Sequence, residues 1–129
     1  MSFKSIGKPL VLANGKTIPL SIAYQVDNVL YLSGQLALNE KGAIVGTDIA
    51  TQTTQVLKNI KGVLSEVECD LSDVFKATIW LTDANNFAVF NEVYGEVFKE
   101  SPPARSAVRC DLLLPDALVE IEVMAYLKS

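Results

Sequence analysis

Two charged residues, an arginine and a glutamate, are the side chains of this chain that we expect to do chemistry. Arg105 follows a Pro-Pro-Ala stretch, and Glu120 lies in Val119-Glu-Ile-Glu-Val123, where apolar and charged residues alternate as in a half-buried strand. Charged side chains are seldom fully buried unless they are paired. A guanidinium can grip a carboxylate through two parallel hydrogen bonds, and a carboxylate in a partly dry cleft transfers protons near neutral pH. The pair therefore predicts a site for a small carboxylate substrate that reacts by proton transfer and attack of water.

The same two residues also fit a purely structural role. Arg105 and Glu120 would then pair with each other, or with Arg109 and Glu122, across neighbouring strands. The pattern of residues alone leaves both interpretations open.

Smaller groups extend the predicted site. Ser33 supplies a hydroxyl, and the peptide N–H groups near Gly34 and Ala107 are suited to orienting a substrate oxygen. Neither cysteine is expected to be catalytic. Cys110 alternates onto the same side of its strand as core residues, and Cys69 follows the first predicted helix.

Composition excludes several classes of function. The chain has 129 residues, half of them hydrophobic, so residues 1–129 fit one globular domain with its own core. It has no histidine, which excludes Ser-His catalysis and His-ligated metals, and its two cysteines are not spaced as metal ligands. The net charge of −4 argues against a nucleic-acid partner. No apolar run reaches membrane-spanning length and the N-terminus lacks the pattern of a signal peptide, so we expect a cytoplasmic protein without a membrane partner.

The hydrophobic periodicity predicts an α+β domain with the element order ββαβαββ. We expect strands at 18–26, 29–35, 74–82, 104–113 and 118–127, and helices at 48–67 and 84–99. Leu10 to Ala13 fits a short edge strand, followed by a turn at Asn14-Gly15. Both helices should pack on one face of a mixed sheet through right-handed crossovers.

Alternation along the strands assigns each residue to a face. The helix-facing side is expected to carry Leu30, Leu32, Phe75, Ala77, Ile79, Leu81, Val108, Cys110, Ile121, Val123 and Ala125. The opposite side is expected to carry Tyr31, Ser33, Lys76, Thr78, Trp80, Arg105, Ala107, Arg109, Glu120, Glu122, Met124 and Tyr126. Aromatic residues, Met and Arg are enriched at protein interfaces. We therefore expect this second side to pack against other copies of the chain, with polar groups meeting in clefts between them.

Four stretches of the sequence, in this order and at these separations, resemble the RidA/YjgF family of small cytosolic proteins. They are Leu32-Ser33-Gly34-Gln35, Phe87-Ala88-Val89-Phe90-Asn91-Glu92-Val93-Tyr94, Pro103-Ala104-Arg105-Ser106 and Val119-Glu120-Ile121-Glu122. The resemblance implies a chorismate-mutase-like fold and a homotrimer with a ligand cleft between each pair of subunits. It also implies hydrolysis of reactive enamines and imines, such as 2-aminoacrylate and 2-iminopropanoate, with no metal or organic cofactor.

The resemblance also implies a role for four residues. It places the carboxylate-binding arginine of the family on Arg105, the acid/base glutamate on Glu120, the cleft serine on Ser33 and the helix asparagine on Asn91.

Two positions depart from the pattern of the best-known deaminases of the family. Leu20 stands where those proteins carry a cleft tyrosine, and Ala107 stands where they carry a cysteine. The arginine and the glutamate are intact, so the activity is expected to be kept, with a different or bulkier imine as a possible substrate. The alternatives are a non-catalytic module that binds 2-oxo acids in the same cleft, or a ribonuclease-type inhibitor of translation.

Overall fold

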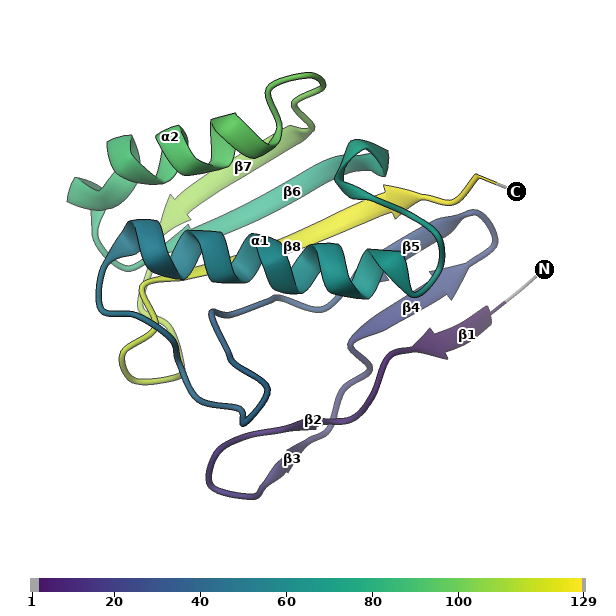
Figure 1. Ribbon diagram of the computed structural model, residues 1–129, viewed down its shortest axis with the longest axis horizontal. Helices are drawn as coiled ribbons and strands as arrows, with labels where there is room; N and C mark the ends of the chain where they lie inside the picture. The colour runs from purple at the N-terminus through teal and green to yellow at the C-terminus, as the bar shows by residue number, and fades with distance from the viewer. Residues whose placement is uncertain (1–2, 129) are drawn as a thin grey trace.

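The computed structural model describes residues 3–128, and its central feature is a mixed six-stranded sheet (Figure 1). The strands lie in the order β1-β4-β5-β8-β6-β7. Their bounds are Phe3–Ile6 for β1, Ala23–Val26 for β4, Val29–Leu32 for β5, Val119–Tyr126 for β8, Val74–Leu81 for β6 and Ala104–Arg109 for β7. β6 and β7 are parallel, and the other neighbouring strands of this sheet are antiparallel. The prediction of a mixed sheet is confirmed.

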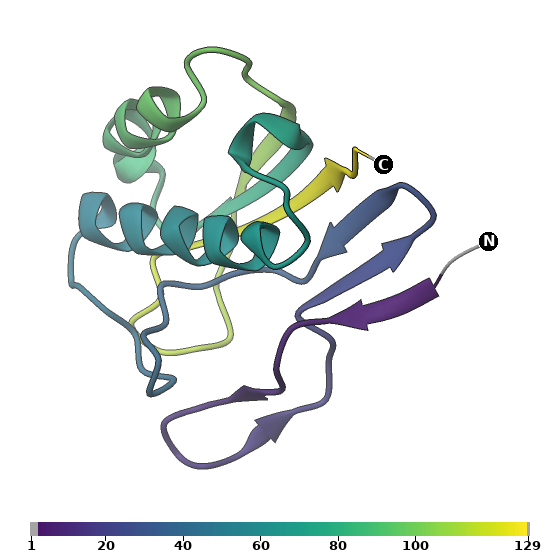
Figure 2. The ribbon, with the colours of Figure 1, turned by 45° about the vertical axis from the view of Figure 1, so that its right-hand side comes forward.

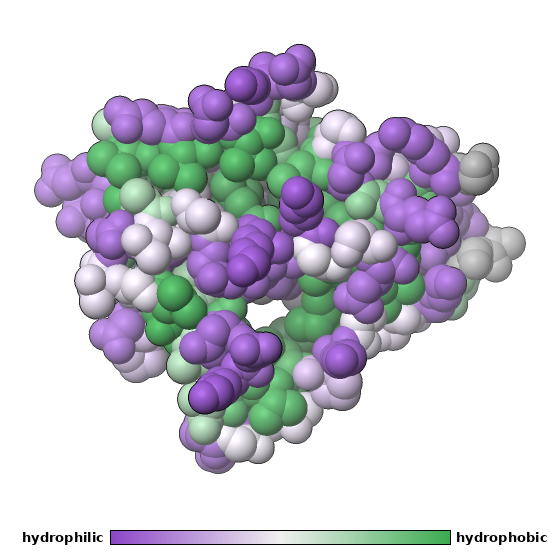
Figure 3. All heavy atoms as spheres, in the orientation of Figure 1, coloured by the Kyte–Doolittle hydropathy of each residue, from purple (hydrophilic) through white to green (hydrophobic). Residues whose placement is uncertain are grey.

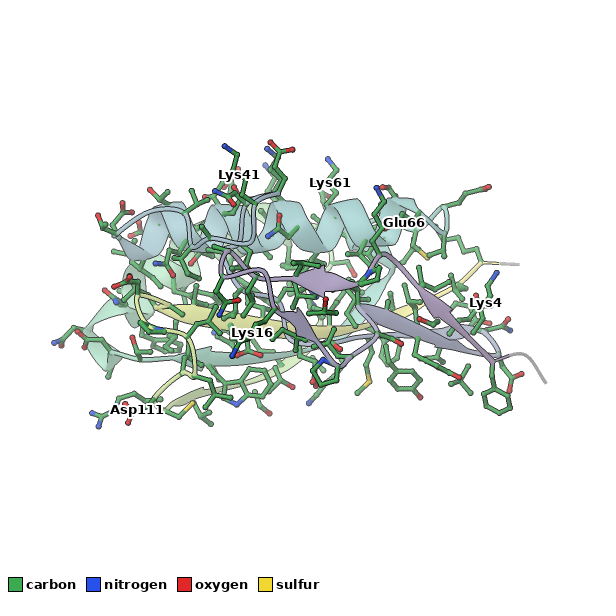
Figure 4. All side chains as sticks on the ribbon, turned by 90° about the horizontal axis from the view of Figure 1, so that it is seen from below. Lys4, Lys16, Lys41, Lys61, Glu66 and Asp111 are labelled. Carbon is green, nitrogen blue, oxygen red and sulfur yellow. The ribbon has the colours of Figure 1, made fainter. Side chains whose placement is uncertain are left out.

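Two helices, α1 (Ile49–Ser65) and α2 (Phe87–Val97), form a second layer on one face of the sheet (Figure 2). Figure 4 shows the two layers from the side, with the labelled Lys61 on the outer surface of α1. The side chain of Asp48 accepts a hydrogen bond of 2.8 Å from the Thr51 N–H and so caps the first turn of α1. Both helices are shorter than predicted. α2 begins later than predicted because 84–86 form the 3₁₀ helix η2. Within residues 3–128, no helix is long and apolar enough to cross a membrane.

The core lies between the helices and the sheet. Its largest fully buried side chains are Phe90, Leu30, Ile60, Leu64, Ile79 and Ile121. These residues come from both helices and from three neighbouring strands, β5, β8 and β6. β8, the strand that carries Glu120, is therefore fixed by the same packing that holds the helices in place.

A short hairpin outside the main sheet precedes β4. It consists of β2 (Leu10–Val11) and β3 (Thr17–Ile18), and its turn contains Asn14 and Gly15, as predicted. The residues expected to form one strand at 18–26 are divided between β3 and β4, with an irregular segment between them. The Ala13 N–H donates a hydrogen bond of 3.1 Å to the Gly42 carbonyl, which ties the hairpin to the turn before α1.

Two predictions about the strand faces are wrong. The pairing of β6 with β8 shifts register between Val74 and Lys76, so Phe75 is 45% exposed and does not face the helices. The second error concerns β7. Arg105 pairs in register with Ala77 and Ala107 with Ile79, and Ala77 and Ile79 belong to the buried core. Arg105 and Ala107 therefore share the helix-facing side.

Arg109 pairs with Leu81 of the core, so it also lies on the helix side, opposite to the prediction. The alternate residues of β7 point the other way. Val108 pairs with Trp80 and is exposed, so it lies on the side away from the helices, opposite to the prediction. Cys110, just beyond the strand, is half-buried and not part of the core. The sequence correctly predicted which residues of β7 share a face, but it assigned each set to the wrong face of the sheet.

Candidate functional site

Arg105 lies where β7 packs against α2. Its Nη2 donates a hydrogen bond of 2.7 Å to Oδ1 of Asn91, which lies on α2. The guanidinium carbon is 4.9 Å from the ring centre of Tyr94 and 5.7 Å from that of Phe87. These distances permit cation–π attraction, which together with the hydrogen bond holds the planar group in one orientation. We call Arg105, Asn91, Phe87 and Tyr94 the arginine cluster.

Burial and a nearby charge shift the pKa of Tyr94 in opposite directions. Burial raises the pKa of its phenol, and the positive charge of Arg105 lowers it by a smaller amount. Tyr94 is thus a neutral ring under the guanidinium. The hydrogen bond to Asn91 occupies one of the five N–H donors of Arg105, and a carboxylate ligand needs two of the others.

Glu120 lies on β8, where it pairs in register with Trp80 of β6. Its neighbours in the strand, Val119 and Ile121, are fully buried on the helix side, so Glu120 points to the opposite face. Partial burial, and to a smaller extent the negative charge of Glu122, raises the pKa of the Glu120 carboxyl above its ordinary value. A carboxyl of this kind exchanges protons closer to neutral pH than an exposed one does.

Ser33 and Gly34 lie in the segment that continues from β5 alongside β8. Gln35 and Ile121 exchange two backbone hydrogen bonds of 2.8 and 3.0 Å, which fix this segment to the strand of Glu120. The Ser33 hydroxyl donates to the carbonyl of Ser21 at 2.7 Å, so its oxygen stays available as an acceptor. We call Glu120, Ser33 and Gly34 the glutamate cluster.

The structure brings the predicted site residues together as two separate groups. The arginine cluster and Ala107 lie on the helix side of β7, and Glu120 points to the other side of the sheet from β8. The prediction that Arg105 and Glu120 share one face is therefore wrong for a single chain. Among the described residues, ion pairs join Lys99 to Glu96 and Lys128 to Asp73. Pairing of Arg105 with Glu120 within the chain is thus not observed.

The aromatic part of the arginine cluster was not predicted. Phe87 and Tyr94 appear in the sequence only as parts of the stretch 87–94 that resembles the family, and Asn91 lies between them on the same side of α2. A single amide within an aromatic stripe at helical spacing was the signal that could have identified them. Within residues 3–128, no group of three or more His, Cys, Asp or Glu residues is placed to hold a metal ion.

Three hollows adjoin the two clusters. Ser33 and Gly34 line the largest, about 840 Å³, which lies between α1, the segment 33–40 and the β2–β3 hairpin. Figure 3 shows an opening at this place. A hollow of about 180 Å³ is bordered by Phe87, Ala107 and Arg109. Another of about 260 Å³ is bordered by Asn91, Tyr94 and Arg105. Open space thus remains beside each cluster.

Residues 14–127 match the model of the family described as Endoribonuclease L-PSP. The chain belongs to this family. It is the RidA/YjgF family that the sequence motifs resemble, so that prediction is confirmed. Nearly the whole described chain, including both clusters, lies within the part that matches the L-PSP family model.

Relatives in the L-PSP family include proteins named as deaminases. The 3-aminoacrylate deaminase RutC of Acinetobacter baylyi is 40% identical over 123 residues, which cover 92% of this chain and 98% of that protein. The human 2-iminobutanoate/2-iminopropanoate deaminase is 37% identical over 114 residues, which cover 88% of this chain and 83% of that protein. A RutC family protein of Pyrococcus horikoshii is 49% identical over 109 residues, which cover 84% of this chain and 86% of that protein. The crystal structure of yeast Mmf1 superposes with a TM-score of 0.88 at 31% identity and covers 98% of this chain and 100% of that one.

Proposed function

We propose that this protein is a deaminase of reactive 2-imino acids and their enamine tautomers. The substrates are of the 2-iminopropanoate and 2-aminoacrylate type, and the products are 2-oxo acids and ammonia. The names of two relatives support this class of reaction. The observation that carries the proposal is the chemistry of the two clusters: an oriented guanidinium with free donors, and a desolvated carboxyl.

The active protein is a homotrimer, in which the arginine cluster of one subunit faces the glutamate cluster of the next. The two clusters lie on opposite faces of one sheet, so they can form one cleft only between subunits. The sheet face away from the helices exposes large apolar side chains, which supports subunit contact there. These include Tyr24, Tyr31, Phe75, Val108 and Tyr126. A head-to-tail contact of this kind closes into a ring when its rotation fits.

In the proposed reaction, Arg105 binds the substrate carboxylate with two parallel hydrogen bonds, while Asn91 and the aromatic rings hold the guanidinium still. Protonation of the enamine carbon gives the iminium, which is the electrophile. Glu120 takes a proton from a water molecule as the water oxygen bonds to the iminium carbon. Protonated Glu120 then returns the proton to nitrogen, the carbon–nitrogen bond breaks and ammonia leaves. The carbonyl forms as the hydroxyl group releases its proton to solvent, which replaces the proton that solvent gave to the enamine carbon. Acid–base help of this kind contributes about 10²–10⁴ in rate.

The smaller residues of the clusters complete the site. Ser33, with its hydroxyl proton donated to Ser21, offers an acceptor oxygen to the iminium or the attacking water. The peptide N–H groups at Gly34 and Ala107 are the proposed donors to substrate oxygens. Leu20 and Ala107 replace a tyrosine and a cysteine of other deaminases, which widens the cleft and favours imines with apolar side chains.

A non-catalytic 2-oxo acid sensor would use the same carboxylate anchor, but it would not need a carboxyl with a raised pKa. The ribonuclease alternative is disfavoured by the net charge of −4 and the absence of histidine. Both cysteines are free thiols, which fits the cytoplasmic location that we propose.

The test is an imine assay. A serine dehydratase generates 2-aminoacrylate in the presence of the protein, and the release of pyruvate is followed against the spontaneous rate. We expect catalytic amounts of the protein to accelerate release well beyond that rate. Binding of pyruvate without any acceleration would instead establish the sensor.

A further inference from the structure

Gly34 lies directly against the side chain of Glu120. A Cβ atom built on Gly34 would overlap Oε2 of Glu120, and it would lie 2.9 Å from Cδ and 3.2 Å from Cγ. Contacts below 3.0 Å are essentially absent from real structures, so the carboxylate occupies the volume that any side chain at position 34 would need.

The backbone of Gly34 does not itself require glycine. Four of the seven glycines of the chain, Gly7, Gly15, Gly42 and Gly46, have a positive φ, which favours glycine. Gly34 is not among them, so alanine can adopt its conformation. Gly62 and Gly95 have nothing within 4 Å of an added Cβ. At position 34, therefore, the absence of a side chain matters because the Glu120 carboxylate occupies the space that a side chain would take.

The backbone on both sides of Gly34 is held by hydrogen bonds. The Ser33 N–H donates to the Ile22 carbonyl at 2.8 Å, and Gln35 is paired with Ile121 by two bonds. The atoms of Glu120 near Gly34 are, in contrast, the far end of a flexible side chain. A side chain at position 34 would thus displace the Glu120 carboxylate and leave the backbone in place.

We propose that Gly34 is a positioning residue for Glu120, and that its lack of a side chain lets the carboxylate rest against the backbone beside β8. This role rests on the proposed deaminase function, and it is distinct from contact between the Gly34 peptide and the substrate. The charged group that acts on Glu120 is Glu122 on its own strand. Across β6, Glu120 pairs with Trp80 and Glu122 with Thr78, and the segment 33–36 carries no charged residue. Displacement from Gly34 therefore changes mainly the burial of the carboxylate.

The test compares Gly34→Ala with Gly62→Ala as the matched control, because both substitutions add one methyl group. The Glu120 carboxyl is titrated by NMR in glutamate-labelled protein without substrate. We expect its pKa to fall toward the ordinary value in Gly34→Ala, as burial is lost, and to stay unchanged in Gly62→Ala. We expect kcat of Gly34→Ala to fall about 10- to 100-fold. In a Glu120→Gln background, the same change should alter residual turnover less than about twofold.

An unchanged Glu120 titration in folded Gly34→Ala overturns the proposal. So does a loss of kcat that is undiminished in the Glu120→Gln background. If Gly34→Ala fails to fold, the double variant Gly34→Ala/Glu120→Ala decides between two causes. Recovery of folding in the double variant supports the contact between Gly34 and Glu120. Continued failure shows that the backbone at position 34 cannot accept alanine. A wild-type protein without imine turnover would refute the deaminase function, but the titration would still decide whether Gly34 positions Glu120.

Discussion

Arg105 and Glu120 project from opposite faces of one sheet, and β6 lies between their strands. Arg105 is fixed on the helix side by its pairing with Ala77, and Glu120 on the other side by its pairing with Trp80. The proposed anchor for a carboxylate and the proposed base for water thus belong to the same chain but cannot serve the same substrate within it. This separation makes subunit contact a requirement of the proposed chemistry.

The hydrogen bond between Asn91 and Arg105 should matter for ligand binding. We predict that Asn91→Ala weakens pyruvate binding about 10-fold, because the guanidinium loses a charge-assisted bond that fixes its orientation. Arg105→Ala should weaken binding at least about 100-fold, and Arg105→Lys should recover little, since an ammonium cannot form the planar fork. Calorimetric titration measures all three. The exposed Asn85, in the 3₁₀ helix η2 just before α2, provides the control Asn85→Ala, which should bind normally.

Glu120→Gln should separate binding from turnover. The amide keeps the shape of the side chain but cannot accept the proton of water, so kcat should fall about 10²–10⁴-fold. Binding of 2-oxobutyrate should survive or tighten, because a negative charge near the ligand carboxylate is lost. Wild-type turnover by Glu120→Gln would show that the glutamate is only a strand-pairing partner.

The raised pKa of Glu120 predicts how activity depends on pH. Glu120 must be ionised to accept a proton, so kcat/KM should fall as the pH is lowered through its pKa, at a higher pH than for an ordinary glutamate. Glu122→Gln removes the like charge that helps raise this pKa, so the acidic limb of the profile should move to lower pH. An acidic limb that does not move would show that another group controls the profile.

Much of this fold follows from periodicity, because buried stripes define the helices and alternation defines the strands. Alternation alone, however, states only which residues share a face. In β7 the sequence is Ala-Arg-Ser-Ala-Val-Arg, so neither alternating set is clearly more apolar than the other, and the register with Ala77 decides which set faces the core. Phe75 was misplaced for another reason. A bulge at this point interrupts the alternation, and its cause lies in the pairing of β6 with β8.

Arg105, Glu120, Ser33, Gly34 and Asn91 could be proposed from the motifs. Their division into two clusters could not, because it depends on the strand order β8-β6-β7. The contact of Gly34 with Glu120 was equally hidden, since it depends on a bridge between Gln35 and Ile121, which are far apart in sequence.

The exposed sheet face should hold the trimer together. Tyr31 on β5 is 43% exposed in the subunit, so Tyr31→Lys should leave the subunit folded but place a charge in the contact. We predict that light scattering shows a trimer for the wild type and monomers for Tyr31→Lys, together with loss of turnover. Val97→Lys, at the exposed end of α2, is the control and should remain trimeric. If the wild-type protein is a stable monomer at micromolar concentration, the proposed cleft between subunits does not form.

The cysteines should be dispensable for turnover. Cys69 is buried and its thiol contacts the Tyr126 carbonyl at 3.7 Å, and burial raises the pKa of this thiol, which disfavours a thiolate nucleophile. Cys110 lies beyond β7 with its backbone N–H bonded to the Leu81 carbonyl. The double Cys→Ser variant should keep kcat within about twofold. Loss of activity without loss of folding would assign a thiol to the mechanism.

Mixing two inactive variants tests the shared cleft most directly. Arg105→Ala and Glu120→Gln subunits are unfolded together, refolded as mixed trimers and assayed for imine hydrolysis. If each cleft takes its arginine from one subunit and its glutamate from the next, roughly a quarter of the clefts in a random mixture are intact. The account predicts recovery of about a quarter of wild-type turnover from two inactive parents. Turnover no greater than the average of the two parents would contradict it, because both residues would then act within one chain.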